Sequence, residues 1–232
     1  VASANDACVA MAEYISGSEG DFVKLMNARA EELGMSNTHF VNCCGLDAEE
    51  HLTTARDVAL MSRELLRNHP QIHEYCTIWM ENITHQTARG SFEFGLTNTN
   101  KLIRQYEYAT GLKTGYTSVA GFCVSASAKK ENIELVAVIM GGADSKSRFQ
   151  DAVTLLNSGF ACCSLYTDEN RAALPNIPVK GGVEGQVGLQ YADEFSYVST
   201  DGSNLSQVER VPELPEEVTA PVEKGDRIGS MV

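Results

Sequence analysis

The 232-residue sequence lacks an excess of positive charge and lacks any long apolar run. Its formal net charge is −13. A nucleic-acid backbone or an anionic membrane surface would repel so acidic a chain, so we expect neither as a partner. The longest aliphatic run, residues 135–140, is far too short to cross a bilayer and is typical of a buried strand.

The sequence also lacks the residue spacing of a metal site. It has seven cysteines, an odd number, and none forms a C-x-x-C pair. We expect these cysteines to be small buried hydrophobic residues rather than a disulfide framework. The five histidines contain no H-E-x-x-H spacing, which argues against a metallo-carboxypeptidase.

An initiator methionine and a signal-peptide pattern are missing at the start, which reads VASAND. We therefore expect the chain to be a segment that begins inside a longer protein.

Helical periodicity and capping residues predict three helices in the first part of the chain. The first begins at Asn5 or Asp6 and ends at Ser16, and the second begins at Asp21. The third covers residues 53–70, where Thr54 and Asp57 resemble a capping pair.

Strand-like pieces follow Cys76, with residues 96–104 as a polar loop. Residues 119–128 and 133–140 predict an antiparallel hairpin because a polar turn separates two β-rich runs. Ser145 is expected to cap an amphipathic helix. Its apolar face would carry Phe149, Val153, Leu156 and Phe160.

Helices on an antiparallel sheet make an α+β pattern over residues 1–167. From about Asp168, prolines and glycines punctuate short strand-like runs, which predicts a small all-β domain over 168–232. The linker between the two domains is expected near residues 171–178.

The segment Lys113-Thr114-Gly115 combines a cation, a hydroxyl and a bare backbone at the head of a strand. Strand alternation places Lys113 and Gly115 on one face and Thr114 on the other. This arrangement suits the carboxylate end of an extended peptide laid along the strand. The alternative is a lysine in a turn before a strand.

A second short motif, Ser3-Ala4-Asn5, precedes the first predicted helix. Alone it could be a helix cap. Ser-x-Asn followed by Lys-Thr-Gly, 110 positions later, is the combination typical of penicillin-binding proteins and class A β-lactamases.

The chain resembles the D-alanyl-D-alanine carboxypeptidases of the low-molecular-weight penicillin-binding type. The similarity extends beyond the two motifs, in order, through residues 22–47, 53–66, 97–104, 111–130 and 136–142. It covers about residues 1–165, and the rest resembles the small β domain that follows in these enzymes. The resemblance implies a penicillin-binding/β-lactamase-like transpeptidase fold that is incomplete at its N-terminus.

The resemblance also implies roles for individual residues. Ser3 would help pass a proton to the leaving amine, Asn5 would donate to a substrate carbonyl, and Lys113 would maintain the positive potential of the site. Thr114 would bind the terminal carboxylate, and Gly115 would leave room for the substrate. The backbone N–H of Tyr116 would contribute to the oxyanion hole. Arg148 would lie near the carboxylate pocket, or else be a solvated helix charge.

The nucleophile motif of that family, Ser-x-x-Lys, is absent from its expected place. The single match in the chain is Ser127 with Lys130. It lies on a predicted strand, where positions three apart point to opposite sides, so we reject it. We expect the serine and lysine in a missing N-terminal segment, possibly a separate chain; an inactive relative is the other explanation.

The expected activity is serine-type removal of the terminal D-alanine from peptidoglycan stem peptides through an acyl-enzyme, with β-lactams reacting at the same serine. No metal or organic cofactor is implied. Such enzymes work in the bacterial envelope outside the cytoplasm, and any membrane anchor would lie outside this sequence. The alternatives are a non-catalytic cell-wall-peptide binding module and a β-lactamase-like hydrolase.

Overall fold

The computed structural model describes residues 2–169 and 171–232. The chain divides into two compact units, Val1–Ala161 and Cys162–Val232. The elements of the first part are α1 (Asn5–Ser16), α2 (Glu19–Glu32), α3 (Ala55–Asn68), α4 (Ile72–Cys76), β1 (Met80–Thr87), β2 (Gly90–Thr97), α5 (Leu102–Gln105), β3 (Ala109–Thr117), β4 (Gly121–Lys130), β5 (Ile133–Gly142) and α6 (Ser147–Cys162).

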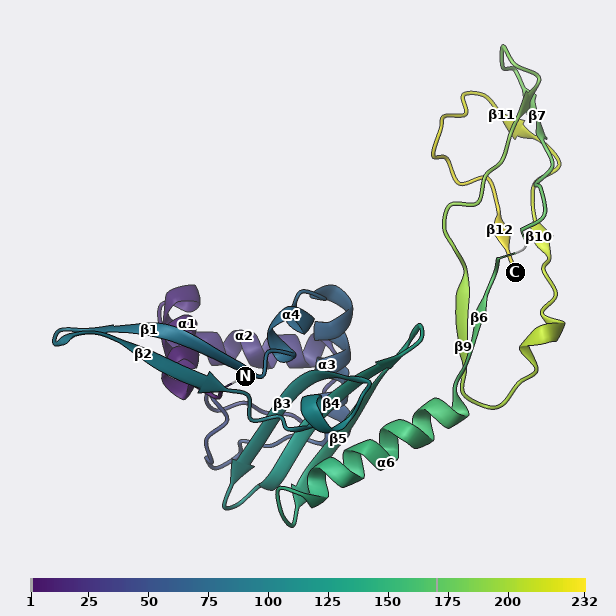
Figure 1. The fold of residues 1–232 in the computed structure, drawn as a ribbon. Coiled ribbons are helices and arrows are strands. Elements are labelled where there is room, and N and C mark those ends of the chain that lie inside the picture. Colours follow the sequence, from purple (N-terminus) through teal and green to yellow (C-terminus); the bar gives the residue numbers. More distant parts are fainter. Residues whose placement is uncertain (1, 170) are drawn as a thin grey trace. The chain divides into compact units, whose positions relative to one another are not determined.

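The central sheet of the first unit is antiparallel in the order β3-β4-β5 (Figure 1). The predicted hairpin is confirmed as β4 and β5, joined at a turn where Glu131 has a φ of 55°. The register pairs Lys113 with Ser125 and Gly115 with Cys123. The expected α+β fold, with helices on an antiparallel sheet, is therefore confirmed.

Helices α3 and α6 cover opposite faces of this sheet. From β4, Ser125 shares a hydrogen bond of 2.7 Å with Ser62 of α3, whereas the next residue back, Val124, packs in a core cluster with Leu156 of α6. Neighbouring residues of a strand point to opposite faces, so the two helices sandwich the sheet between them. The predicted apolar face of α6 is confirmed, with Phe149 and Leu156 buried and Val153 and Phe160 packed at the edge of the cluster.

The helix starts differ in part from the prediction because serine and aspartate side chains compete as caps. The Thr54 cap of α3 is confirmed, since its hydroxyl accepts from the backbone N–H of Asp57. The predicted Asp21 cap of α2 is wrong. Ser18 lies three residues earlier and its hydroxyl accepts from the backbone N–H of Asp21, so α2 begins at Glu19.

Two further cap predictions are also corrected. Helix α1 begins at Asn5 with Ala4 at its cap position and no side-chain cap, so neither Asn5 nor Asp6 caps it. At α6 the carboxylate of Asp144, rather than Ser145, accepts from the backbone N–H groups of Lys146 and Ser147.

The polar segment 96–104 is not all loop as predicted, because α5 begins at Leu102. Leu102 is fully buried in the core cluster with α6, and this packing stabilises a helical turn that polar composition alone did not indicate.

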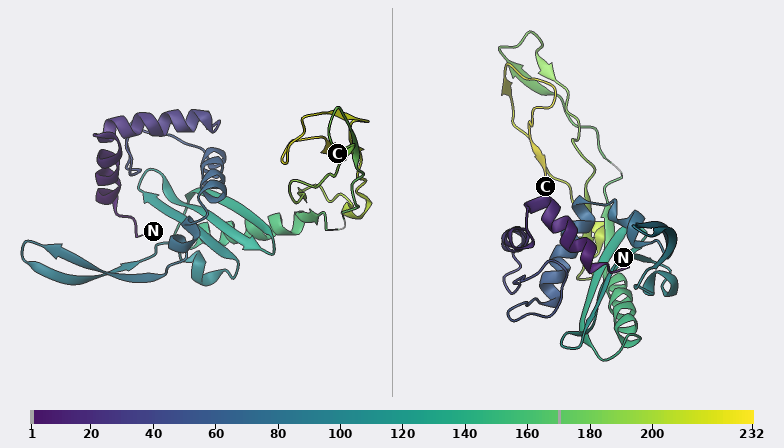
Figure 2. Two further views of the ribbon diagram at one scale, coloured as in Figure 1. Left: turned by 90° about the horizontal axis from the view of Figure 1, so that it is seen from above. Right: turned by 90° about the vertical axis from the view of Figure 1, so that its left-hand side faces the viewer.

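Strands β1 and β2 form a separate two-stranded hairpin (Figure 2). Its pairing runs from Met80 with Thr97 to Thr87 with Gly90, and nearly all of its residues are exposed. One face carries Ile83, Phe92 and Phe94, all partly exposed to solvent.

The second unit contains short strands and one 3₁₀ turn. The strands are β6 (Ser164–Thr167), β7 (Ile177–Lys180), β8 (Gln186–Val187), β9 (Ser196–Ser199), β10 (Pro212–Glu213), β11 (Val218–Thr219) and β12 (Ser230–Met231). They form small sheets in the orders β6-β9, β11-β7-β8 and β10-β12. Apart from the 3₁₀ turn, the regular elements described after α6 are all strands, in agreement with the prediction.

The expectation that the cysteines are buried is wrong for all but Cys76. All seven cysteines are free, but only Cys76 is buried, while Cys8 and Cys162 are exposed. The neighbours Cys43 and Cys44 do not bond to each other, and burial raises the pKa of Cys43 to about 11.

Candidate active site

The predicted site is built on β3, whose residues alternate between exposed and buried over Lys113–Gly115. Lys113 and Gly115 are exposed and Thr114 between them is buried, as expected for successive residues of a strand. Strand β3 is at the edge of the sheet, so the side of β3 away from β4 has no strand partner among the described residues. An edge of this kind can accept an extended peptide through main-chain hydrogen bonds.

The structure brings Ser3 to Lys113 although 110 positions separate them. The Lys113 ammonium donates to Ser3 Oγ at 3.1 Å and to the backbone carbonyl of Thr114 at 2.6 Å. Ser3 has a φ of 70°, which an L-residue rarely adopts. Such a conformation persists only where its surroundings determine it, and the contact with Lys113 is one such determinant.

Desolvation makes the charged form of Lys113 less favourable than it is in water. Surrounding protein atoms lower the pKa of Lys113, the Cys8 thiol opposes this change, and the Arg148 cation adds to it. Lys113 retains an exposed surface, so its positive charge can still act on a ligand along the edge of β3.

Thr114 is 6% exposed, and its hydroxyl donates to Thr99 Oγ1 at 2.7 Å. Thr99 lies in the segment between β2 and α5 and is itself exposed. Thr99 was not among the predicted site residues. The Asn-Thr-Asn spacing was the available signal, because asparagine side chains bind nearby backbone groups and can fix such a segment.

Arg148 is 6% exposed and lies under β3 and β4. Its guanidinium donates to the backbone carbonyls of Gly115 and Cys123, each at 3.0 Å, and lies over the rings of Phe122 and Phe149. Desolvation lowers its pKa. The alternative of a solvated helix charge is therefore wrong, because Arg148 is a buried link between the two strands.

Gly115 and Tyr116 continue the exposed edge of β3. A Cβ atom added at Gly115 would contact only the Cβ of Cys123, at 3.9 Å, so the backbone here is open to a ligand. The ring of Tyr116 is 61% exposed and packs against Phe122 with centroids 4.4 Å apart.

Asn5 is exposed at the first position of α1, two residues after Ser3. The motif Ser3-Ala4-Asn5 therefore joins a residue in contact with Lys113 to the start of a helix.

Ser127 was rejected as a nucleophile, and its surroundings agree with this. It is fully buried on β4, and its hydroxyl shares a hydrogen bond of 2.8 Å with Thr110 Oγ1. Lys130 is at the end of the same strand, so no helix brings the two side chains to one face.

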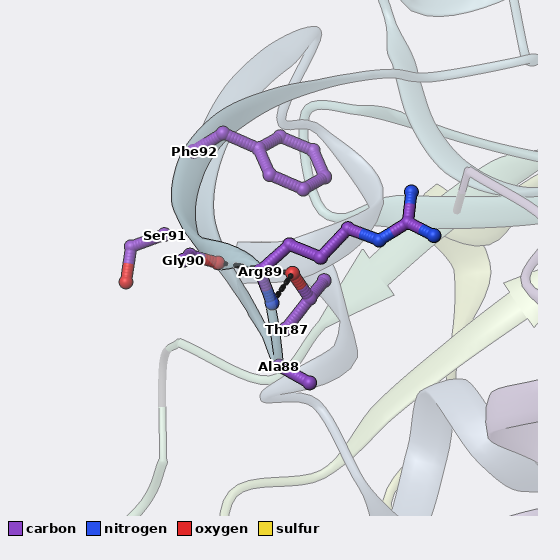
Figure 3. A pocket seen from close by; sticks show the side chains of 6 residues that line it. All are labelled: Thr87, Ala88, Arg89, Gly90, Ser91 and Phe92. Carbon is purple, nitrogen blue, oxygen red and sulfur yellow. Dashed lines mark hydrogen bonds between the residues drawn. The ribbon is translucent and has the colours of Figure 1, made fainter.

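A separate hollow lies at the turn of the β1–β2 hairpin (Figure 3), where the backbone N–H of Arg89 donates to Thr87 Oγ1 at 3.2 Å. None of the predicted site residues lines it. Over residues 2–169 and 171–232, no group of three or more histidine, cysteine or acidic side chains is placed to hold a metal ion.

Comparisons with known proteins identify a family that the chain matches. The profile of the peptidase S11 family, described as D-alanyl-D-alanine carboxypeptidase, matches residues 1–144. D-alanyl-D-alanine carboxypeptidase DacF of Bacillus subtilis is 36% identical over the whole chain, which covers 59% of that protein.

The chain is also similar to solved structures of penicillin-binding proteins. The crystal structure of penicillin-binding protein 5 from Haemophilus influenzae has a TM-score of 0.72 and 30% identity, and the match covers 99% of this chain and 65% of that one. Penicillin-binding protein D2 from Listeria monocytogenes, in its cefotaxime-bound form, has a TM-score of 0.59 and 33% identity, covering 68% of this chain and 62% of that one. The chain thus spans about three-fifths of the length of these relatives.

Proposed function

The chain belongs to the D-alanyl-D-alanine carboxypeptidase family, and from this premise we propose that the protein carrying it removes the terminal D-alanine of peptidoglycan stem peptides. The observation that carries the proposal is the 3.1 Å contact between Lys113 and Ser3 on an open strand edge. A serine hydroxyl attacks the carbonyl of the terminal peptide bond, the C–N bond breaks, and water then hydrolyses the ester.

The serine and its lysine belong, in this proposal, to a segment of the protein outside these residues. Two observations support this. The chain spans 59% of its Bacillus subtilis relative, and its Ser127-x-x-Lys130 match is buried on a strand. Residues 1–167 would then be the C-terminal portion of the catalytic domain, followed by a small β-sandwich-like domain over 168–232.

Each site residue has a role in this mechanism. Lys113 attracts the substrate carboxylate, and the Thr114 hydroxyl donates to it. Gly115 lets the peptide approach β3, and the backbone N–H of Tyr116 donates to the oxyanion that forms in the transition state. Ser3 relays a proton to the leaving amine, which departs as free D-alanine, and Asn5 donates to a substrate carbonyl.

Arg148 contributes from beneath the strand. Because its guanidinium is bound to the carbonyls of Gly115 and Cys123, we infer that it fixes the carboxylate-binding segment and adds positive potential there. This role is compatible with the expected position of Arg148 near the carboxylate pocket.

β-Lactams are the expected inhibitors, since their ring amide replaces the scissile bond. An extracytoplasmic location in the bacterial envelope follows from the substrate. None of the described helices is long and apolar enough to cross a membrane.

The test is labelling of the full-length protein with a fluorescent penicillin, together with measurement of D-alanine released from a stem pentapeptide. We expect stable labelling and D-alanine release, both lost in Lys113→Gln. The matched control is Lys24→Gln, which changes an exposed lysine paired with Asp21 on α2. Absence of labelling would instead indicate a binding module, and rapid loss of the label a β-lactamase.

A further inference from the structure

Thr99 is exposed between two buried neighbours. Asn98 is 4% exposed and Asn100 is fully buried, so the short segment turns its middle residue outward. The Thr99 hydroxyl oxygen accepts the hydrogen of the buried Thr114 hydroxyl at 2.7 Å. The residue proposed to bind the substrate carboxylate thus contacts a residue from a different part of the chain.

The two asparagines fix this segment through main-chain contacts. The Asn98 side-chain amide donates to the carbonyls of Cys76 and Ile78, at 2.9 and 3.0 Å, and its oxygen accepts from the backbone N–H of Asn100 at 2.8 Å. The Asn100 oxygen accepts from the backbone N–H of Leu102 at 3.1 Å. These hydrogen bonds hold the backbone on both sides of Thr99, so the fold determines where Thr99 lies.

We propose that Thr99 is a positioning residue that orients the Thr114 hydroxyl for binding the terminal carboxylate of the substrate. This inference rests on the proposed function, since it assigns a second residue to the same subsite. In this proposal Thr99 acts on the substrate through Thr114.

The physical basis is a pair of hydroxyl groups whose hydrogens can turn. Without substrate, Thr114 donates to Thr99, which satisfies a buried hydroxyl and holds it in one orientation. A carboxylate is a stronger acceptor than a hydroxyl, so on binding the Thr114 hydrogen turns to the carboxylate. Thr99 can then donate to the Thr114 oxygen, and the resulting chain of hydrogen bonds polarises the donor and strengthens its bond to the substrate.

The decisive variant is Thr99→Val in the full-length protein, which removes the hydroxyl and keeps the shape. The probe is a non-cleavable D-Ala-D-Ala peptide with a reduced scissile amide, prepared with a free C-terminal carboxylate and as its C-terminal amide. Binding of both forms is measured by titration calorimetry, and D-alanine release from the cleavable peptide is measured separately.

We expect Thr99→Val to weaken binding of the carboxylate form about tenfold, because a Thr114 hydroxyl that is neither oriented nor polarised loses much of its hydrogen bond to the charged group. Binding of the amide form should change less than about twofold, because the charged acceptor is absent. Thr99→Ser should restore binding of the carboxylate form to within about threefold of wild type, since it returns the hydroxyl. The matched control, Thr84→Val on the exposed hairpin, should leave both forms unchanged.

Equal binding of the carboxylate form by wild type and Thr99→Val would overturn the inference, as would an equal loss for both forms. A wild-type protein that releases no D-alanine would overturn the proposed function alone. The carboxylate-selective loss in Thr99→Val remains measurable by calorimetry in that case.

Discussion

Replacing Arg148 by methionine tests whether this buried cation links β3 to β4. The guanidinium donates to the carbonyls of Gly115 and Cys123 at 3.0 Å each and lies 4.8 Å from the ring centroid of Phe149. Methionine retains the length and apolar character of the side chain but donates no hydrogen bond, so two carbonyls lose their side-chain donor.

The magnitude follows from these contacts. Two hydrogen bonds from a charged group contribute together about 3–6 kcal/mol, and the cation–π contacts contribute about 1 kcal/mol. Desolvation of the guanidinium, which also lowers its pKa, opposes this by several kcal/mol. We therefore expect a net loss of about 2–3 kcal/mol in the free energy of unfolding, or about 4–12 °C in Tm.

Thermal unfolding of the full-length protein measures this loss. The control is Arg63→Met, at an exposed position of α3, where Tm should change by less than about 1 °C because surface substitutions cost little. Arg148→Lys should fall between the two, since a single ammonium lacks the planar fork that spans two carbonyls. A Tm for Arg148→Met within about 2 °C of wild type would refute the reasoning, since the contacts would then contribute nothing net.

Two further predictions concern charge. Desolvation lowers the pKa of Lys113 below the ordinary 10.5, so Lys113 should lose its charge at a lower pH than a free lysine. Affinity for the carboxylate form of the D-Ala-D-Ala peptide, measured by calorimetry across pH 7–11, should fall as pH rises through that lowered pKa. An affinity that is constant up to pH 10.5 would contradict this. Burial of Asp57 opposes its ionisation, but hydrogen bonds from Thr38, Asn37 and Thr54 together leave its pKa below the ordinary 3.8. Asp57 therefore contributes stability above its ordinary pKa of 3.8, and this contribution is lost as pH falls through the lowered pKa. Asp57→Asn should lower Tm at pH 7, and its difference from wild type should shrink as pH falls below 3.8; equal Tm values at pH 7 would count against it.

Sequence patterns predicted those parts of the fold that depend on local spacing. The β4–β5 hairpin follows from two β-rich runs around a polar turn, and the Thr54 cap follows from its spacing to Asp57. The Ser18 cap was missed because Asp21 is an equally good capping residue by type, and only the backbone geometry decides between them.

The candidate site depends even more on contacts between distant residues, which the sequence does not reveal. The residues on β3 could be selected from the motif itself, because a strand places alternate residues on opposite faces. Thr99 could not be selected from a motif. Its importance depends on a contact with Thr114, 15 positions away, and on the flanking asparagines that hold the segment in place. Arg148 was selected, but its hydrogen-bond partners could not be predicted. The sequence does not indicate that the carbonyls of Gly115 and Cys123 face the guanidinium.

These contacts explain how an edge strand can stay in place although one of its sides has no strand partner among the described residues. An unpaired edge has free main-chain groups, which favour binding of another strand but do not fix their own position. Here Arg148 donates to the carbonyl of Gly115, Thr99 accepts from the hydroxyl of Thr114, and Lys113 donates to the hydroxyl of Ser3. Each support comes from a different part of the chain, so loss of one should weaken carboxylate binding while the others keep the strand in place. Combined loss of Arg148 and Thr99 should therefore weaken binding of the carboxylate form by more than the product of the single effects, because the remaining support no longer holds both ends of the segment.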